Sequence, residues 1–529
     1  MLDILILGGT VVDGTGRAGF RADVGVKDGK IAEIGRHIGV GAVRTVDARG
    51  CCVTPGFLDI HRHADAAVLK PGFGKAELMQ GLTTVVNGNC GLSAAPCPAE
   101  RREALYAYLA PVTGHVPEGL HTESLQAYLA QLRTLPLRVN VGMLAGLGTL
   151  RAGVCGYAAQ MDEAAKRTLQ VRLEEALVSG ILGVSLGLGY APESFFTTQE
   201  LICALQPVKG SGMPVTVHMR QEGSGVVGAL TEMLTVARAI KTPVEISHLK
   251  AIGRENWKTA VPEMLGLLDH ARQEGLDIGC DVYPYPAGST QLVHILPPEL
   301  QSGGAAALTQ KLCDPMFRAH ARARMETGDD FENIVKLVGW ENIVLSSLSR
   351  DENRPLTGKS MAEAAALLGK DAYDAAFDLL QSEACGISMI DFITDEQDIT
   401  AILQAEFSCV ISDATYPDTG LWHPRVYGAF ARVLERYVRQ SRALTLEQAV
   451  HKMTGRPAQV LGLTRKGRLA EGMDADVCVF DPETVCERGT YDDPAQYARG
   501  MRYVLVNGQL AVDDGEVSGN RSGRVVTRV

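Results

Sequence analysis

Residues 53–63 read VTPGFLDIHRH, an apolar run followed directly by two histidines. Residues two apart on a β-strand point to the same side, so the imidazoles of His61 and His63 can reach one metal ion. We therefore predict a strand over residues 53–60 with a pair of metal ligands at its carboxyl end.

Four further apolar segments carry, at or next to their ends, a residue type that binds metal ions. They read TTVVNGNC, PVTVHM, PVEISHL and FSCVISD, and they supply Cys90, His218, His248 and Asp413. Ligands at the ends of several strands are typical of a metallo-hydrolase built on a parallel barrel. Thiolate, imidazole and carboxylate groups together favour zinc. The predicted metal ligands are His61, His63, Cys90, His218, His248 and Asp413.

Two of these residues have ordinary alternatives. A cysteine is often a small buried packing residue, but Cys90 lies in the turn NGNCG, where a thiolate can point into a barrel mouth and bridge two ions. Asp413 could cap a helix, but a carboxylate beside a metal can also take a proton from water. We predict that Cys90 is a ligand and that Asp413 is also the catalytic base.

Composition narrows the class of protein. The chain has 529 residues and a net charge of −11, which argues against nucleic acid or an anionic membrane as the main partner. The first residues, MLDILILGG, lack the basic segment of a secretory signal, and no apolar run has the length of a membrane span. The twelve cysteines form no C-x-x-C motif. We expect a cytoplasmic enzyme with a small-molecule substrate; its oligomeric state stays open.

The order of elements predicts an α/β fold. Eight strand-like runs rich in Val, Ile and Leu alternate with helical patterns, and eight is the number that a (β/α)8 TIM-type barrel requires. Helices are predicted at Glu163–Val178 and, with a capping box from Thr445 and Gln448, at Leu446–Met453. The predicted barrel strands are 53–60, 83–89, 139–145, 181–188, 214–219, 243–248, 276–283 and 407–413.

The two ends of the chain look all-β. Short β-rich runs with Asp-Gly or Asn-Gly turns occur at both ends, and we expect 1–54 and 462–529 to form one small β-sandwich beside a barrel of 55–461. The stretch of sequence from Tyr283 to Asp413 is too long to be a single loop. We therefore predict an inserted lobe over 286–346, after the seventh strand.

Longer motifs resemble a known family. The segments HRH, GNCG, HMR, SHLK, DVYPYPAGST, SDA, HPRVYGAFARVL and GRLAEGMDADVCVFDP are similar to those of the D-aminoacylase (N-acyl-D-amino-acid deacylase) family of the amidohydrolase superfamily. The resemblance covers nearly the whole chain and is weakest around 290–390. It implies a tightly held zinc on Cys90, His218 and His248, a weaker second site on His61, His63 and Asp413, and Asp413 as general base and acid.

An N-acyl amino acid carries a free carboxylate, which needs cations and hydrogen-bond donors. Arg425 and Lys250 are the predicted cations, and Tyr283 and Ser289 the predicted hydroxyl donors, as the resemblance also implies. Tyr190 is expected to polarise the scissile carbonyl or to line the acyl pocket. The alternative for Lys250 and Arg425 is a solvated surface cation, and the alternative for the tyrosines is packing of a buried aromatic ring.

Some positions depart from the family pattern. Leu147 stands where a histidine is usual and Leu186 where a threonine is common, and SDATYPDTG replaces the usual SDG turn. With Leu188, these leucines favour a hydrophobic substrate over N-acyl-D-glutamate. His294 either faces the pocket or lies at the surface.

The predicted reaction is zinc-dependent hydrolysis of the amide bond of an N-acyl-D-amino acid to a carboxylate and a free D-amino acid. The D preference follows from the resemblance alone. One alternative is a cyclic amidase of the hydantoinase or dihydroorotase type, although the segment GILGVSLGLGY lacks the lysine that bridges two metals in those enzymes. A mononuclear deaminase, and a scaffold protein that has lost its chemistry, are the others.

Overall fold

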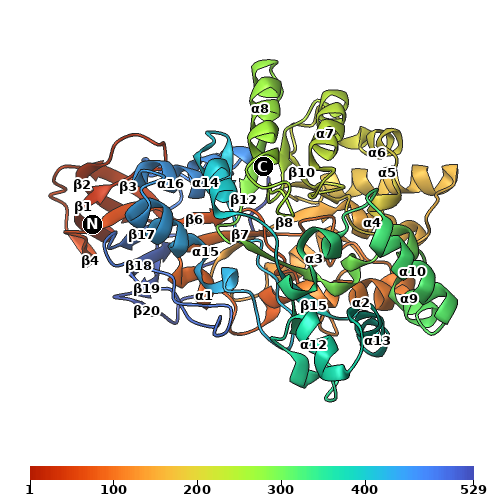
Figure 1. The fold of residues 1–529 in the computed structure, drawn as a ribbon. Helices are drawn as coiled ribbons and strands as arrows, with labels where there is room; N and C mark the ends of the chain where they lie inside the picture. The colour runs from red at the N-terminus through yellow and green to blue at the C-terminus, as the bar shows by residue number, and fades with distance from the viewer. Residues whose placement is uncertain (529) are drawn as a thin grey trace.

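A parallel eight-stranded barrel lies at the centre of the chain in the computed structural model, which describes residues 1–528 (Figure 1). Neighbouring strands pair in the order β16-β12-β11-β10-β9-β8-β7-β6. A parallel bridge between Arg62 and Ala414, just past β6 and β16, brings the two ends together. The predicted TIM-type barrel is confirmed, with strands β6 (Phe57–Asp59), β7 (Leu82–Asn87), β8 (Asn140–Gly146), β9 (Gly183–Gly187), β10 (Val215–His218), β11 (Val244–Ile246), β12 (Ile278–Val282) and β16 (Ser408–Val410).

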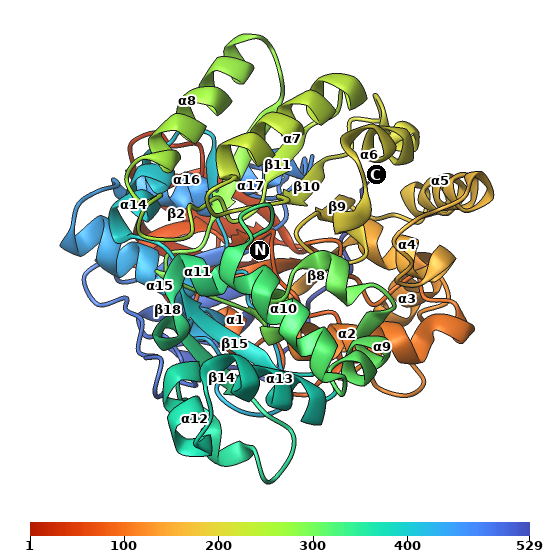
Figure 2. The same cartoon turned by 45° about the vertical axis from the view of Figure 1, so that its right-hand side comes forward.

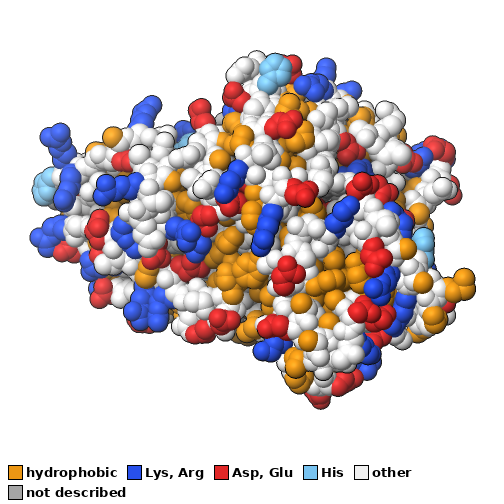
Figure 3. All heavy atoms as spheres, viewed as in Figure 1, with side chains coloured by type: hydrophobic (Ala, Val, Ile, Leu, Met, Phe, Trp, Pro, Cys, Tyr) orange, Lys and Arg blue, Asp and Glu red, His pale blue; other side chains and the backbone are white. Residues whose placement is uncertain are grey.

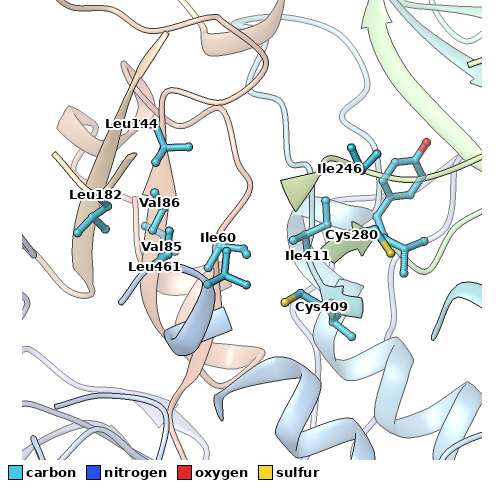
Figure 4. Close-up of a cluster of buried hydrophobic side chains, with 14 of the residues drawn as sticks. Ile60, Val85, Val86, Leu144, Leu182, Ile246, Cys280, Cys409, Ile411 and Leu461 are labelled. Carbon is cyan, nitrogen blue, oxygen red and sulfur yellow. The ribbon is translucent and has the colours of Figure 1, made fainter. Parts of the chain in front are cut away.

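Apolar side chains fill the barrel and the layer outside it. Every residue of these strands is buried, because helices cover the outer face and side chains fill the inner one. Figure 4 shows part of this core, in which Val85, Leu144 and Ile246 come from barrel strands and Leu461 follows α17 (Gly455–Val460).

Helices surround the barrel (Figure 2). The predicted helix after Asp162 is α5, and α16 begins after Thr445 with the predicted capping box. The principal helices of this layer are α1 (Lys75–Met79), α2 (Arg102–Thr113), α3 (Leu125–Leu132), α4 (Leu147–Cys155), α5 (Glu163–Leu177), α6 (Thr198–Ala204), α7 (Val226–Ile240), α8 (Ala260–Gln273), α14 (Glu396–Gln404), α15 (Arg425–Arg432) and α16 (Leu446–Met453).

Both ends of the chain contribute to one nine-stranded sheet. Its order is β20-β19-β18-β17-β5-β1-β2-β3, with β4 beside β1. Three of its hairpins turn at Asp28-Gly29, Asn507-Gly508 and Asp514-Gly515, where both residues of each pair have positive φ, as tight hairpin turns require. The strands are β1 (Leu2–Val11), β2 (Phe20–Lys27), β3 (Lys30–Gly35), β4 (Ala42–Asp47), β5 (Cys52–Pro55), β17 (Val477–Phe480), β18 (Met501–Val506), β19 (Gln509–Asp513) and β20 (Glu516–Val517).

The run 53–60 is divided between two sheets, which corrects the prediction of one continuous strand. Val53 lies in β5 of the terminal sheet, whereas Phe57 begins β6 of the barrel. Pro55 lacks a backbone donor, and a Cβ on Gly56 would stand 2.2 Å from Oγ1 of Thr83. The chain therefore changes sheets at these two residues.

A lobe with its own apolar cluster follows β12. Its sheet pairs β13 (Ala287–Gln291), β15 (Ser388–Phe392) and β14 (Ile343–Ser347), in that order. The cluster extends from Leu292 to Met389, so the separate packing continues beyond residue 346. The helices of the lobe are α9 (Gly304–Lys311), α10 (Pro315–Thr327), α11 (Ile334–Val338), α12 (Met361–Leu368) and α13 (Ala372–Ser382).

Acidic and basic side chains are interspersed on the face of the molecule that Figure 3 shows. Among residues 1–528, none of the helices combines the length and the apolar character needed to cross a bilayer.

Candidate functional site

Five of the six predicted ligands form two overlapping triads at or just past the carboxyl ends of the barrel strands. His61, His63 and Cys90 make one triad, and Cys90, His218 and His248 make the other. The ligand atoms within each triad lie within 4.8 Å of one another. Cys90 Sγ is 3.2 Å from Nε2 of His61 and 3.4 Å from Nε2 of His248, so one thiol stands between two groups of histidines.

The His-x-His pair lies on one side of its segment, as predicted. The intervening Arg62 points away, with Nε 3.1 Å from Oδ2 of Asp59 and Nη1 2.9 Å from Oε1 of Glu77. These two buried carboxylates hold the arginine on the far side. His61 and His63 are therefore free to face Cys90 and Asp413.

Three predicted ligands have left-handed backbone conformations. The φ angles are 52° at Cys90, 36° at His248 and 52° at Asp413. Such values are uncommon for residues other than glycine and occur where the surroundings impose them, often at functional sites. All three residues lie just past the ends of barrel strands, where Cys90 contacts His248 and Asp413 contacts His63.

Asp413, the sixth predicted ligand, borders the first triad. Its Oδ1 is 3.2 Å from Nε2 of His63 and 3.4 Å from Nε2 of His61. Burial raises the pKa of Asp413, but Arg425 and His63 lower it, and the net pKa lies well below the ordinary value. The carboxylate is thus ionised, the state that a metal ligand or a general base requires.

The donor set fits a divalent cation. Burial raises the pKa of the Cys90 thiol, but His61 and His248 lower it by more than burial raises it. The net pKa is well below its usual range. Burial lowers the pKa of His63, whereas hydrogen bonds with Asp413 and Cys90 raise it to about 9. Cys90 and Asp413 are therefore two buried anions among imidazoles, an arrangement that favours a bound cation. Thiolate with imidazole is a zinc-binding combination. Cys90, His218 and His248 suit one ion, and His61, His63 and Asp413, with the thiolate between them, suit a second.

Sequence reasoning missed two acids that orient these ligands. Oδ2 of Asp281, at the end of β12, is 3.6 Å from Nδ1 of His61, and Oδ1 accepts the backbone N–H of His248. Oε1 of Glu222 is 3.0 Å from Nδ1 of His248, and Nζ of Lys250, which is paired with Oε2 of Glu222, is 2.8 Å from the same nitrogen. Carboxylates that contact the outer ring nitrogen fix the tautomer and orientation of a ligand histidine. For Asp281, its place at a predicted strand end was an available signal; Glu222 lies in a loop and offers none.

The predicted cations both lie at the site, and both are paired. Nη1 of Arg425 is 2.9 Å from Oδ2 of Asp413, and Nη2 donates to the carbonyl of Ser289 at 3.1 Å. Nζ of Lys250 is 2.6 Å from Oε2 of Glu222. Neither is a solvated surface residue, because Arg425 is fully buried and Lys250 nearly so.

The predicted hydroxyl donors lie near these cations. The hydroxyl of Tyr283 is buried without a hydrogen-bond partner in the described chain, and both Lys250 and Arg425 lie over its ring. Oγ of Ser289 is 3.1 Å from Oγ1 of Thr415. A buried, unpaired hydroxyl on a ring that contacts two cations suits an anionic ligand.

Tyr190 forms the middle of an aromatic stack. Its ring centroid is 4.3 Å from that of His218 and 4.3 Å from that of His294. His294 is buried, so the surface alternative for this residue is wrong. Leu147, Leu186 and Leu188 belong to the buried core, and Leu188 also lines a cavity beside Tyr190.

Two cavities meet at this stack. A narrow one is lined by residues that include Lys250, Tyr283, Ser289 and Asp413, and a wider one of about 210 Å³ opens beside it. A larger cavity of about 550 Å³ lies outside the barrel, among residues of α3, α4 and α5. That outer cavity contains none of the predicted ligands, whereas the inner pair is lined by His218, His248 and Asp413.

The chain matches the amidohydrolase family over residues 44–512. It is 37% identical to N-acyl-D-glutamate deacylase of Alcaligenes xylosoxydans xylosoxydans, covering 100% of this chain and 97% of that protein. D-aminoacylase from the same organism is 35% identical, with 99% and 98% covered. The solved structure of N-acyl-D-glutamate deacylase from Bordetella bronchiseptica, complexed with zinc and a phosphonate inhibitor, matches with a TM-score of 0.85 and 34% identity over 100% of both chains.

Proposed function

From the premise that this chain belongs to the amidohydrolase family, and within it to the D-aminoacylases, we propose that it hydrolyses the amide bond of N-acyl-D-amino acids. The products are a carboxylate and a free D-amino acid. One observation carries the proposal: Cys90 stands between two histidine groups, with the ionised Asp413 beside them. A thiolate shared by two triads takes the place of the bridging lysine of cyclic amidases.

Zinc is the metal that this donor set favours, as in the zinc-complexed Bordetella bronchiseptica deacylase. The residues that would hold it are His61, His63, Cys90, His218, His248 and Asp413. The chemistry that zinc supplies at such a site is Lewis acidity toward an amide carbonyl and toward water.

Asp413 acts as base and then as acid. Its Oδ1 faces the first triad, so it can take a proton from the attacking water. It returns that proton to the leaving nitrogen as the C–N bond breaks. One water is consumed: its oxygen goes to the new carboxylic acid, and the transferred proton completes the neutral amine. The acid then loses its remaining proton to the amine or to solvent.

The paired cations and free hydroxyl hold the α-carboxylate of the substrate. Tyr283 offers an unpaired O–H, Ser289 a hydroxyl, and Arg425 and Lys250 positive charge. Together they anchor the substrate so that its acyl group lies toward the histidines. Tyr190, stacked on His218, lines the space for the scissile amide.

Release of free amine from matched N-acetyl-D- and N-acetyl-L-amino acids tests the proposal, with zinc-loaded protein and with Asp413→Asn as the control. Hydrolysis of D substrates only, abolished in the variant, is expected. Hydrolysis of cyclic amides instead, or of neither series by protein with intact zinc content, would overturn it.

A further inference from the structure

The wider inner cavity adjoins the place proposed for the substrate carboxylate. It shares Tyr190, His218, His294 and Glu332 with the narrow cavity that Lys250, Tyr283 and Ser289 line. The carboxylate and the side chain of an amino acid branch from the same carbon. A substrate anchored in the narrow cavity therefore has its side chain within reach of the wider one.

The lobe after β12 builds one wall of this cavity. His294, Leu296 and Phe331 come from the lobe, whereas Leu188 and Phe195 come from the segment after β9. Leu188 and Leu296 are almost fully buried. The volume of about 210 Å³ exceeds the roughly 150 Å³ of a cavity that accepts benzene, so a bulky side chain fits.

His294 is one of two polar side chains in this cavity, with Ser194, whose buried polar atoms have no hydrogen-bond partner among the described residues. It is 9% exposed, and neither ring nitrogen has a hydrogen-bond partner among residues 1–528. Buried polar groups are nearly always paired, so a ligand or water is expected to complete this one. A neutral imidazole offers one donor and one acceptor, which suits an uncharged substituent.

The cavity offers no available positive charge. Arg220 is the one cation among the described residues that lines it, and its Nε and Nη2 lie 2.9 and 3.0 Å from the carboxylate of Glu232. Its Nη1 and Nη2 also donate to the carbonyls of Ser194 and Phe196, both at 2.8 Å. Lys250, in the neighbouring cavity, is paired with Glu222.

Acidic groups line the same space. Glu332 accepts the backbone N–H of Glu222 at 2.6 Å, and Glu299 and Asp330 lie at the mouth, both paired with Arg324. Glu332 is largely uncharged near neutral pH, because burial raises its pKa to about 8. An entering carboxylate would therefore lose its hydration without gaining a counter-charge. Such burial of an unpaired charge is strongly unfavourable.

We propose that this cavity receives the side chain of the D-amino acid and selects a bulky, uncharged one against D-glutamate. The inference rests on the proposed deacylase function. The proposed side-chain preference differs from that named for the N-acyl-D-glutamate deacylases to which this chain is similar.

The proposed selection against a charged side chain is tested with the isosteric pair N-acetyl-D-glutamine and N-acetyl-D-glutamate, and with N-acetyl-D-phenylalanine. We expect kcat/KM for the glutamine and phenylalanine substrates to exceed that for the glutamate substrate by at least about 100-fold. Titration calorimetry of the Asp413→Asn variant should give the same order of affinity in the absence of turnover.

His294→Lys places a cation in the cavity and should raise kcat/KM for N-acetyl-D-glutamate relative to N-acetyl-D-glutamine by at least about 10-fold. His320→Lys is the matched control, because His320 is exposed on α10 of the same lobe. It should leave the ratio unchanged.

The outcomes distinguish this inference from the function on which it rests. Hydrolysis of N-acetyl-D-amino acids with glutamate or lysine as the preferred side chain overturns the inference and leaves the deacylase function intact. Discrimination that follows the charge of the acyl group instead of the side chain also overturns it. Failure with every D substrate overturns the proposed function and this inference together.

Discussion

Arg425 and Asp413 form a buried ion pair in which Nη1 of the arginine is 2.9 Å from Oδ2 of the aspartate. The other carboxylate oxygen of Asp413 faces His61 and His63. One aspartate thus connects the proposed metal ligands to the proposed carboxylate anchor. Substrate binding and proton transfer are expected to be coupled through this pair.

Replacing Arg425 by methionine should lower kcat/KM for N-acetyl-D-amino acids by about 100-fold or more, because the substrate anchor is lost and Asp413 is no longer held in position. Steady-state kinetics with a zinc assay checks this. Arg436→Met, a change at a more exposed arginine after α15, is the control. An unchanged kcat/KM in the Arg425 variant would contradict the role assigned to this pair.

Glu222→Gln should weaken zinc binding by about 10- to 100-fold, since the carboxylate beside Nδ1 of His248 orients that ligand. Competition with a chelator measures the affinity. Glu274→Gln, an exposed acid paired with Arg238, is the matched control. Equal zinc affinity in the two variants would show that Glu222 has no part in orienting His248.

Cys90→Ser should lower zinc affinity and kcat by more than about 100-fold, because both triads lose the thiolate that they share. Metal analysis and steady-state kinetics measure the two effects. Cys203→Ser changes an exposed cysteine and should have no effect. Full zinc content in the Cys90 variant would rule out a bridging thiolate.

Glu245→Gln should change how stability depends on pH. Burial raises the pKa of Glu245 from 4.5 to about 8 in the folded protein, and Arg456, 3.9 Å away, lowers it only in part. Between these values the folded state holds a proton that the unfolded state has released, so stability falls as the pH rises through this interval.

Glu245→Gln lacks this titration. Its free energy of unfolding, relative to that of the wild type, should therefore increase between pH 5 and pH 8 by at least about 1 kcal/mol. Thermal unfolding at both pH values gives the comparison, with Glu263→Gln, an exposed acid on α8, as the control. Parallel pH profiles for the wild type and Glu245→Gln would contradict an uncharged Glu245.

The barrel was predictable because its strands are buried on both faces. Runs such as Val215–His218 and Val244–Ile246 are short, apolar and separated by helical patterns, so their positions follow from local sequence. The hairpins at Asp28-Gly29 and Asn507-Gly508 were visible for a similar reason. The break at Pro55 and Gly56 was missed, because it depends on contact with the following strand.

The candidate ligands were recognisable as residue types at strand ends, but their surroundings were not. Glu222 meets His248 and Lys250 only because the loop after β10 folds back over the site. The left-handed φ values of Cys90, His248 and Asp413 belong to residue types that adopt this conformation only uncommonly. Contacts between distant segments determine these features, and no local pattern records them.

The pairing of Val477 with Pro55 has a consequence for biosynthesis. The strand that completes the N-terminal half of the terminal sheet emerges from the ribosome only after the whole barrel has been made. Until then β5, which leads directly into the first barrel strand, keeps an open edge. The nascent chain is therefore expected to depend on chaperones, and premature termination before β17 should yield aggregation-prone fragments.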